Sequence, residues 1–152
     1  MKKPLIAAAA ILAVLAGCAL NRTAGDGTAF KRPSDYNFLF KAYSVNVTDP
    51  ALDRRCYFRV FIDKIESGRT STGLESQINT FQARLSVNRH LLMVEKWVLD
   101  ERSGKYSKLN NIEQPRPNFF YFEVPADKIV VVTLVNDSTK GRSMYGVEFE
   151  KE

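Results

Sequence analysis

Residues 129–135 read Ile129-Val130-Val131-Val132-Thr133-Leu134-Val135, and this stretch says most about the fold. Six of the seven residues are β-branched. Such side chains are stiff at χ1 and pack well on a pleated sheet, which favours strands over helices. A strand with one solvated face alternates apolar and polar residues, but this stretch is apolar throughout except at Thr133. It therefore predicts a central strand that is buried on both faces.

Other candidate strands lie on both sides of this run, separated by turn signals such as Asp49-Pro50, Ser67-Gly68 and Gly104. They are residues 36–47, 56–65, 91–99, 105–109, 119–124 and 144–149. About seven short strands with little helix are typical of an all-β fold. Because the strand lengths vary and long loops join some of them, we expect one β-sandwich over residues 35–152, mostly antiparallel, rather than a small barrel.

Residues 73–88 allow two interpretations. The spacing of Thr72 and Glu75 matches a helix capping box, and the residues that would then share one helical face are Leu74, Ile78, Phe81 and Leu85. The same segment also alternates as a half-buried strand does, with one side formed by Phe81, Ala83, Leu85 and Val87. We expect a helical turn or loop over residues 73–79 and then a strand to Val87, with a short helix near 73–88 as the alternative.

The first eighteen residues follow a different pattern. Lys2 and Lys3 precede an apolar run over residues 5–16, which has the length of a signal-peptide core and is shorter than the roughly 20 residues of a spanning helix. Leu15-Ala16-Gly17-Cys18 follows, and this resembles the lipobox of bacterial lipoproteins. The resemblance implies that residues 1–17 are a cleaved signal peptide, and that Cys18 carries a diacylglycerol on its sulfur and an acylated amino terminus.

The residue after the cysteine is Ala19 rather than Asp. In the sorting rule of the lipoproteins that this leader resembles, Asp at that position favours the inner membrane. The resemblance therefore implies an outer-membrane anchor, with the domain facing the periplasm. Residues 18–34 are small, polar and aperiodic, which predicts a flexible lipidated tether between membrane and domain. Several acyl chains together would make the anchoring nearly permanent, because a single chain binds a membrane only weakly.

Charge and cysteine content exclude some classes of function. The formal charge of +5 falls to +3 when Lys2 and Lys3 leave with the leader, and acidic and basic residues are interspersed, as in Asp63-Lys64 and Glu95-Lys96. This pattern predicts a solvated surface, with no stripe for binding nucleic acid. With Cys18 lipidated, Cys56 has no partner within the chain. We expect it to pack as a small apolar side chain, with a reactive thiol or an intermolecular disulfide as alternatives.

The sequence predicts no catalytic residue, metal or cofactor. His90 is the single histidine, so a Ser-His-Asp or Cys-His device would have to use it, and we expect a surface or half-buried imidazole near a turn. One histidine and one free cysteine do not make a zinc site. The acidic residues expected in loops lack calcium-loop spacing; they are Asp49, Asp53, Asp100, Glu101 and Asp137. We therefore expect a protein that is not an enzyme.

Aromatic residues form the one candidate interaction surface. Its residues are Trp97, Tyr106, Arg116, Phe119 and Tyr121. Residues 119–122 are all aromatic, so a strand there has aromatic side chains on both faces. Either one face fills the core while residues 110–118 or 70–80 cover the other, or the second face is exposed. Aromatic residues and arginine are what binding hot spots use. An exposed sheet edge is a second route to a partner, through strand addition.

Two functions follow from this pattern. The first is a non-enzymatic, membrane-anchored accessory lipoprotein that docks on a protein of a larger envelope complex. Small lipoproteins of secretion machines, including pilotins, are similar in size, leader and β character. The second is a module that binds a small ligand, glycan or lipid between its sheets. An open cavity lined by Phe58, Phe119, Phe120 and Phe122 would favour the ligand, whereas a closed core with an exposed patch would favour docking.

Overall fold

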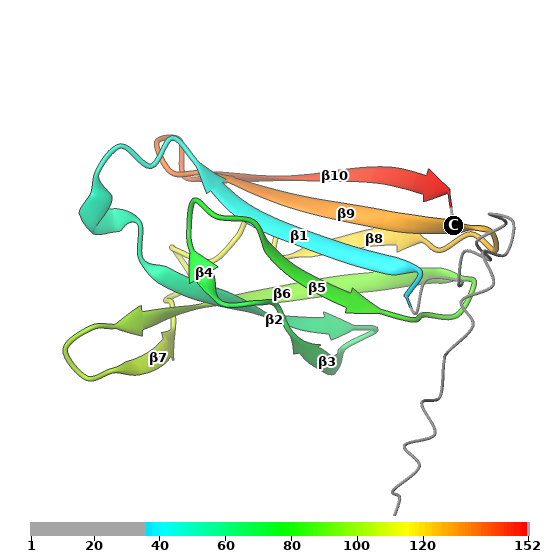
Figure 1. The fold of residues 1–152 in the computed structure, drawn as a ribbon, viewed down its shortest axis with the longest axis horizontal. Helices are drawn as coiled ribbons and strands as arrows, with labels where there is room; N and C mark the ends of the chain where they lie inside the picture. Colours follow the sequence, from blue (N-terminus) through cyan, green and yellow to red (C-terminus); the bar gives the residue numbers. More distant parts are fainter. Residues whose placement is uncertain (1–35, 152) are drawn as a thin grey trace, which may run out of the picture. The chain divides into compact units, whose positions relative to one another are not determined.

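The computed structural model of this chain describes residues 36–151, which form an all-β sandwich of two packed sheets (Figure 1). This confirms the predicted fold class. The expected signal peptide, the tether and Cys18 lie outside the described residues. The strands are β1 (Phe38–Val45), β2 (Arg55–Ile62), β3 (Ile65–Arg69), β4 (Gly73–Leu74), β5 (Asn79–Ala83), β6 (Arg89–Asp100), β7 (Lys105–Lys108), β8 (Phe119–Glu123), β9 (Lys128–Asp137) and β10 (Arg142–Lys151).

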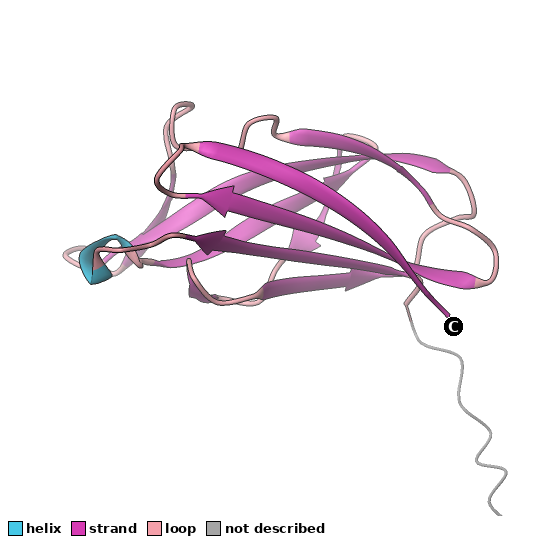
Figure 2. Ribbon diagram, turned by 90° about the horizontal axis from the view of Figure 1, so that it is seen from above, coloured by secondary structure: helices cyan, strands magenta, loops and turns pink. Residues whose placement is uncertain are grey.

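The two sheets differ in their order of strands. In the first, here sheet A, the order is β10-β9-β1-β5, with β1 and β9 parallel and the other pairs antiparallel. In the second, sheet B, the order is β3-β2-β6-β7, all antiparallel. Strand β4 also pairs with β2, and β8 pairs with β6 beyond the end of β7. A 3-10 turn (Pro50–Leu52) lies in the loop from β1 to β2 and is the one helical element in Figure 2.

The stretch that opened the sequence analysis is the central strand β9, held between β1 and β10. Val130, Val132 and Leu134 are fully buried in the core between the sheets. The opposite face of β9 is also buried at Ile129 and Val131, which join a second apolar cluster. Burial on both faces is therefore confirmed for residues 129–132. The remainder of the main core comes from the inward residues of both sheets, among them Phe38, Phe40, Phe58, Val60, Leu92 and Phe122.

Residues 73–88 contain no helix, so the helical turn considered over 73–79 and the alternative helix through 88 are wrong, whereas the loop also allowed over 73–79 is found at residues 75–78. The segment forms β4 and β5, and β5 extends sheet A along the edge of β1. The strand also ends at Ala83 rather than Val87. Beyond it, the Asn37 side chain takes over the hydrogen bonding: Nδ2 donates to the Leu85 carbonyl at 2.9 Å and Oδ1 accepts from the Leu85 N–H at 2.7 Å.

The strand expected over residues 56–65 ends at Ile62, and the chain reverses at Asp63 and Lys64. Both residues have positive φ angles, 53° and 71°, which is the conformation of a tight hairpin turn. Asparagine or aspartate followed by glycine normally marks such turns, so Asp63 fits the first position but Lys64 carries no signal for the second. Ser67-Gly68, expected to be the turn, lies inside β3. Within residues 36–151, no helix has the length and apolar character needed to cross a membrane.

Candidate functional site

The outward side of sheet B carries the aromatic residues that the sequence had singled out. Cross-strand pairing sets Trp97 opposite Lys108, Leu99 opposite Tyr106, Met93 opposite Phe119 and Leu91 opposite Tyr121. Because residues paired in this way share a face, four of the five predicted surface residues lie on one side of the sheet. We call this side the aromatic face and define it by Tyr57, Arg59, Leu91, Met93, Trp97, Tyr106, Phe119 and Tyr121.

One half of the aromatic face is closed on itself. Tyr57 and Trp97 stack with ring centroids 6.1 Å apart and planes 8° from parallel, and Tyr106 lies 5.0 Å from Tyr57. Two guanidinium groups cover the stack, Arg59 at 4.4 Å from the Trp97 centroid and Arg69 at 5.2 Å from that of Tyr57. Tyr57 is only 7% exposed as a result. These cation–π contacts hold the ring system rigidly in place.

The other half is open. Phe119 and Tyr121 are 49% and 52% exposed, and their rings meet edge to face at 6.3 Å. The Arg89 guanidinium covers one side of Tyr121, at 4.7 Å from the ring centroid. The next residue along the strand, Phe122, points inward, is 4% exposed and stacks on Phe38 at 4.8 Å. The run of four aromatics is thus divided between the core and an exposed patch, and no segment of residues 36–151 covers the patch.

The charge on this face is unevenly neutralised. Arg59 is paired with Glu66 at 3.6 Å, and Lys108 is paired with Glu95. Arg69 and Arg89 lie on aromatic rings and, among residues 36–151, no ion pair is formed by either. The face therefore combines exposed rings with two guanidinium groups that still have hydrogen-bond donors to offer.

Arg116, the fifth predicted surface residue, is not on a strand of this face. It lies in the loop from β7 to β8. There its side-chain Nη2 donates to the Asn111 carbonyl at 2.9 Å, and its backbone N–H donates to Ser143 Oγ at 3.2 Å. Its role in the structure is to fold that loop and link it to β10. The prediction that Arg116 shares a surface with the aromatic residues of sheet B is not supported by this placement.

The single histidine lies between an aspartate and a serine. His90 Nδ1 is 2.7 Å from Asp63 Oδ2, and Nε2 is 3.3 Å from Ser86 Oγ, which resembles the order of a Ser-His-Asp device. However, Nε2 also lies 2.9 Å from the Ser86 carbonyl oxygen, which can only accept a hydrogen bond. Both nitrogens therefore donate, as only the imidazolium can. A general base needs a free Nε2, so this contact acts as a clasp between two loops.

The pKa values agree with that clasp. Burial disfavours the charged ring of His90, but the Ser86 carbonyl and the Asp63 carboxylate outweigh it and raise the pKa. The pKa of Asp63 is lowered, first by the Leu91 N–H that donates to it and then by His90. His90 was expected on the surface or half-buried, but only 7% of it is exposed.

A buried ion pair inside the sandwich was not predicted. Lys96 Nζ donates to Glu75 Oε2 at 2.6 Å, with both side chains less than a tenth exposed, and Arg54 Nε lies 3.2 Å from Glu75 Oε1. Lys96 had been expected in a solvated charge pattern and Glu75 in a capping box, and both expectations are wrong. The sequence signal that was missed is the alternation of side chains along β6. Lys96 occupies an even-numbered position and therefore points the same way as the buried Leu92, Val94 and Val98.

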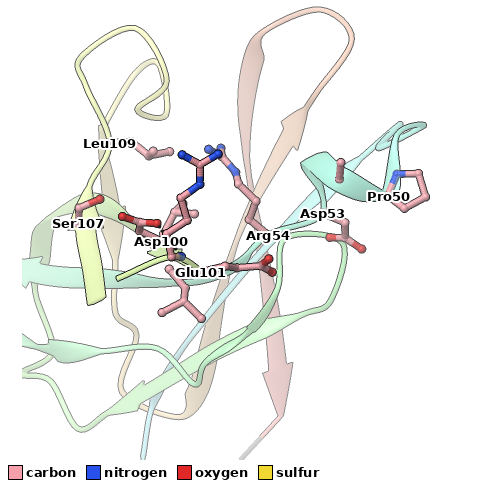
Figure 3. A pocket seen from close by; sticks show the side chains of 11 residues that line it. Pro50, Asp53, Arg54, Asp100, Glu101, Ser107 and Leu109 are labelled. Carbon is pink, nitrogen blue, oxygen red and sulfur yellow. Dashed lines mark hydrogen bonds between the residues drawn. The ribbon is translucent and has the colours of Figure 1, made fainter. Parts of the chain in front are cut away.

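The depression beside this pair carries charges of both signs. Figure 3 shows Arg54 lining this depression together with the loop carboxylates Asp53, Asp100 and Glu101. Asp53 accepts from the Ser76 N–H and hydroxyl, and Asp100 accepts from the Arg102 N–H and the Ser103 hydroxyl. Asp100 thus fixes its own turn, and Asp53 links the loop before β2 to the turn at Ser76. Across the described part of the chain, no three His, Cys, Asp or Glu side chains converge as metal ligands.

Cys56 is fully buried and unpaired in this structure. Its sulfur lies 3.8 Å from Asn79 Nδ2, which donates to it, and burial raises the pKa of the thiol to about 11. This agrees with the expectation of a small apolar side chain.

Comparison with known proteins adds no relative: no family model, curated protein or solved structure matches this chain.

Proposed function

We propose that this protein is a non-enzymatic envelope lipoprotein, anchored to the outer membrane through Cys18, whose aromatic face docks on an acidic surface of a larger envelope complex. Phe119 and Tyr121, half-exposed side by side with Arg89, are the observation that carries this proposal. Exposed aromatic rings beside arginine are the composition of binding hot spots. Tethering supports a modest interface, because it raises the local concentration of the domain near its partner.

The chemistry of the partner follows from the charges on the face. Arg69 and Arg89 offer guanidinium groups already ordered by aromatic rings, so little side-chain entropy is lost when a carboxylate binds them. An acidic surface with aromatic or aliphatic side chains at its centre would satisfy both features. A secretion-type complex remains one candidate among envelope assemblies.

The alternative, a ligand held between the sheets, loses the support that had been named for it. Phe58 and Phe122 are 1% and 4% exposed inside a closed core, whereas Phe119 lies on the outward face. The four phenylalanines therefore do not line one open cavity. The depression in Figure 3 has charged residues in its walls and no aromatic residue among those that line it.

The anchor is tested by acyl labelling. Cells that make the full chain are fed a clickable palmitate analogue, and the membrane fraction is analysed by gel and mass spectrometry. The proposal expects label on the wild type and none on Cys18→Ser, which should also stay uncleaved. Processing between residues 17 and 18 without any acyl mass would contradict the lipid anchor.

The docking face is tested by placing a photo-crosslinking benzoylphenylalanine at Phe119 or Tyr121 in the full chain, with Gln82 on β5 as the matched control. We expect one partner to crosslink from both aromatic positions and not from residue 82. Arg89→Glu should lower the yield at Phe119 by at least about tenfold if an acidic surface is bound. Equal crosslinking from all three positions, or indifference to Arg89→Glu, would contradict docking through this face.

A further inference from the structure

Within the part of the chain that the structure describes, strand β10 leaves one of its two edges unpaired. It is the outermost strand of sheet A, bonded to β9 on one side only, and Figure 2 shows it running along the border of the sheet to the C mark. The strand is ten residues long. An unpaired edge is a template for another strand, and natural proteins protect it by keeping it short or charged. Strand β10 is long, and residues 143–147 carry no charge.

Apolar side chains are exposed on both faces of this strand. Met144 points outward and is 63% exposed. Val147 and Phe149 are paired with Val132 and Val130, so they lie on the core side, yet they are 36% and 53% exposed. The sandwich therefore leaves apolar surface open along this border on both faces, which a strand added beside β10 would cover in part.

The middle of the strand is a glycine that its own chain does not require. A Cβ placed on Gly146 would meet nothing within 4 Å. Glycine weakens a strand interior and is found where another backbone approaches closely. The unpaired edge, the exposed apolar residues and this glycine all lie on the same strand.

We infer that β10 pairs antiparallel with β10 of a second copy of this chain, centred on Gly146. A two-fold axis perpendicular to the sheet relates the copies, as in an isologous interface. The core-side faces of the two copies then lie on the same side of the joined sheet. Even-numbered residues of one copy therefore oppose even-numbered residues of the other. Gly146 opposes Gly146 of the second copy, and the two A sheets join into one sheet of eight strands.

The overlap of the two strands and the charges at their ends together support this register. Centring on Gly146 sets Arg142 of each copy opposite Glu150 of the other, twice by symmetry. On the core side, Phe149 lies beside Ser143 and Val147 lies beside Tyr145 of the other copy. Centring on Val147 gives the same overlap but sets Glu150 against Met144 and places the residue opposite Arg142 at position 152, beyond the end of β10. Opposite charges across a sheet stabilise one register over another.

This pairing leaves the aromatic face free. That face belongs to sheet B, whereas β10 is the border of sheet A. The inference is therefore independent of the proposed docking partner, and each can fail without the other.

A self-crosslink tests the pairing in the full chain within its own envelope. In Gly146→Cys the two new cysteines would lie opposite each other, within the roughly 7 Å between Cα atoms that a disulfide spans. In Met144→Cys, each cysteine opposes Glu148 and is about four residues, or roughly 13 Å, from its copy. We expect a disulfide-linked dimer from Gly146→Cys on a non-reducing gel, and none from Met144→Cys or from the wild type.

Charge reversal supplies the second readout. In the Gly146→Cys background, Arg142→Glu or Glu150→Arg alone should lower the dimer fraction at least about threefold, and the two together should restore it. Retained protection of Cys56 from a thiol reagent reports that each variant is folded. Absence of the Gly146→Cys dimer in folded protein would overturn the inference. Equal crosslinking of Met144→Cys, or a yield that ignores charge reversal, would also overturn it.

Discussion

The Lys96 ammonium lies 2.6 Å from Glu75 Oε2 inside the sandwich, and neither side chain is more than 7% exposed. Removing one partner of a buried pair leaves a charge that is neither solvated nor neutralised. We expect Glu75→Leu to lower the free energy of unfolding by about 3–5 kcal/mol, measured by urea denaturation. Glu75→Leu/Lys96→Met should recover most of that loss, because an apolar pair removes both desolvation costs.

The exposed pair of Lys108 and Glu95 provides the control, since Lys108→Met should change the free energy of unfolding by less than about 1 kcal/mol. A double variant at residues 75 and 96 that is no more stable than Glu75→Leu would mean that the buried ions do not act as a pair.

The His90 clasp predicts a dependence of stability on pH. Because the folded pKa of His90 is raised, the stability it contributes is complete below about pH 6.5, the usual histidine value, and is lost as pH rises through the folded pKa. Asp63 has a lowered pKa, so its contribution is present above about pH 3.9 and is lost on further acidification. The wild type should therefore be more stable at pH 5.5 than at pH 8, relative to His90→Gln.

Asp63→Asn should reduce this pH dependence and cost about 0.5–1.5 kcal/mol of unfolding free energy near pH 5.5, the net value of a hydrogen bond. A histidine NMR titration measures the same effect directly, through a lower pKa of His90 in Asp63→Asn. A His90 pKa at or below its usual value in the wild type would contradict the clasp.

How far the sequence predicts this fold depends on whether a signal is local. The strand pattern, the double burial of residues 129–132 and the alternation along β6 follow from side-chain period alone. The turn at Asp63 and Lys64 was missed because Lys64 stands at the position where a glycine normally marks such a turn. The helix considered over residues 73–88 failed because Glu75, read as a cap, instead meets Lys96 from another strand.

The candidate surface also divides into features that local sequence predicts and features that depend on distant segments. Strand alternation identified aromatic residues on both faces of β8, but the sequence could not tell which face was covered, because covering depends on distant segments. Trp97, Tyr106, Phe119 and Tyr121 came together through pairing with β6, which is a property of topology. Arg116 was grouped with them by closeness in sequence, and its loop contacts with Asn111 and Ser143 separate it from that face.

Neighbouring aromatic residues on β8 should differ sharply in their effect on stability. Phe122 is packed in the core, so Phe122→Ala should lower the free energy of unfolding by about 3–5 kcal/mol. Phe119 is half-exposed, so Phe119→Ala should change it by less than about 1 kcal/mol. Thermal or urea denaturation of the two variants makes the comparison, and similar losses would mean that Phe119 is covered in the folded protein.

The thiol of Cys56 should be inert in the folded protein and reactive after unfolding. Burial raises its pKa to about 11, which leaves almost no thiolate at neutral pH, and the thiolate is the nucleophile. A maleimide added at pH 7.5 should label Cys56 at the rate at which the domain opens, and label it fully in urea. Asn79→Ala, which removes the donor at 3.8 Å from the sulfur, should speed labelling only through lower stability. Rapid labelling of the stable wild type would instead favour a reactive thiol, because a buried, protonated sulfur has no route to the reagent.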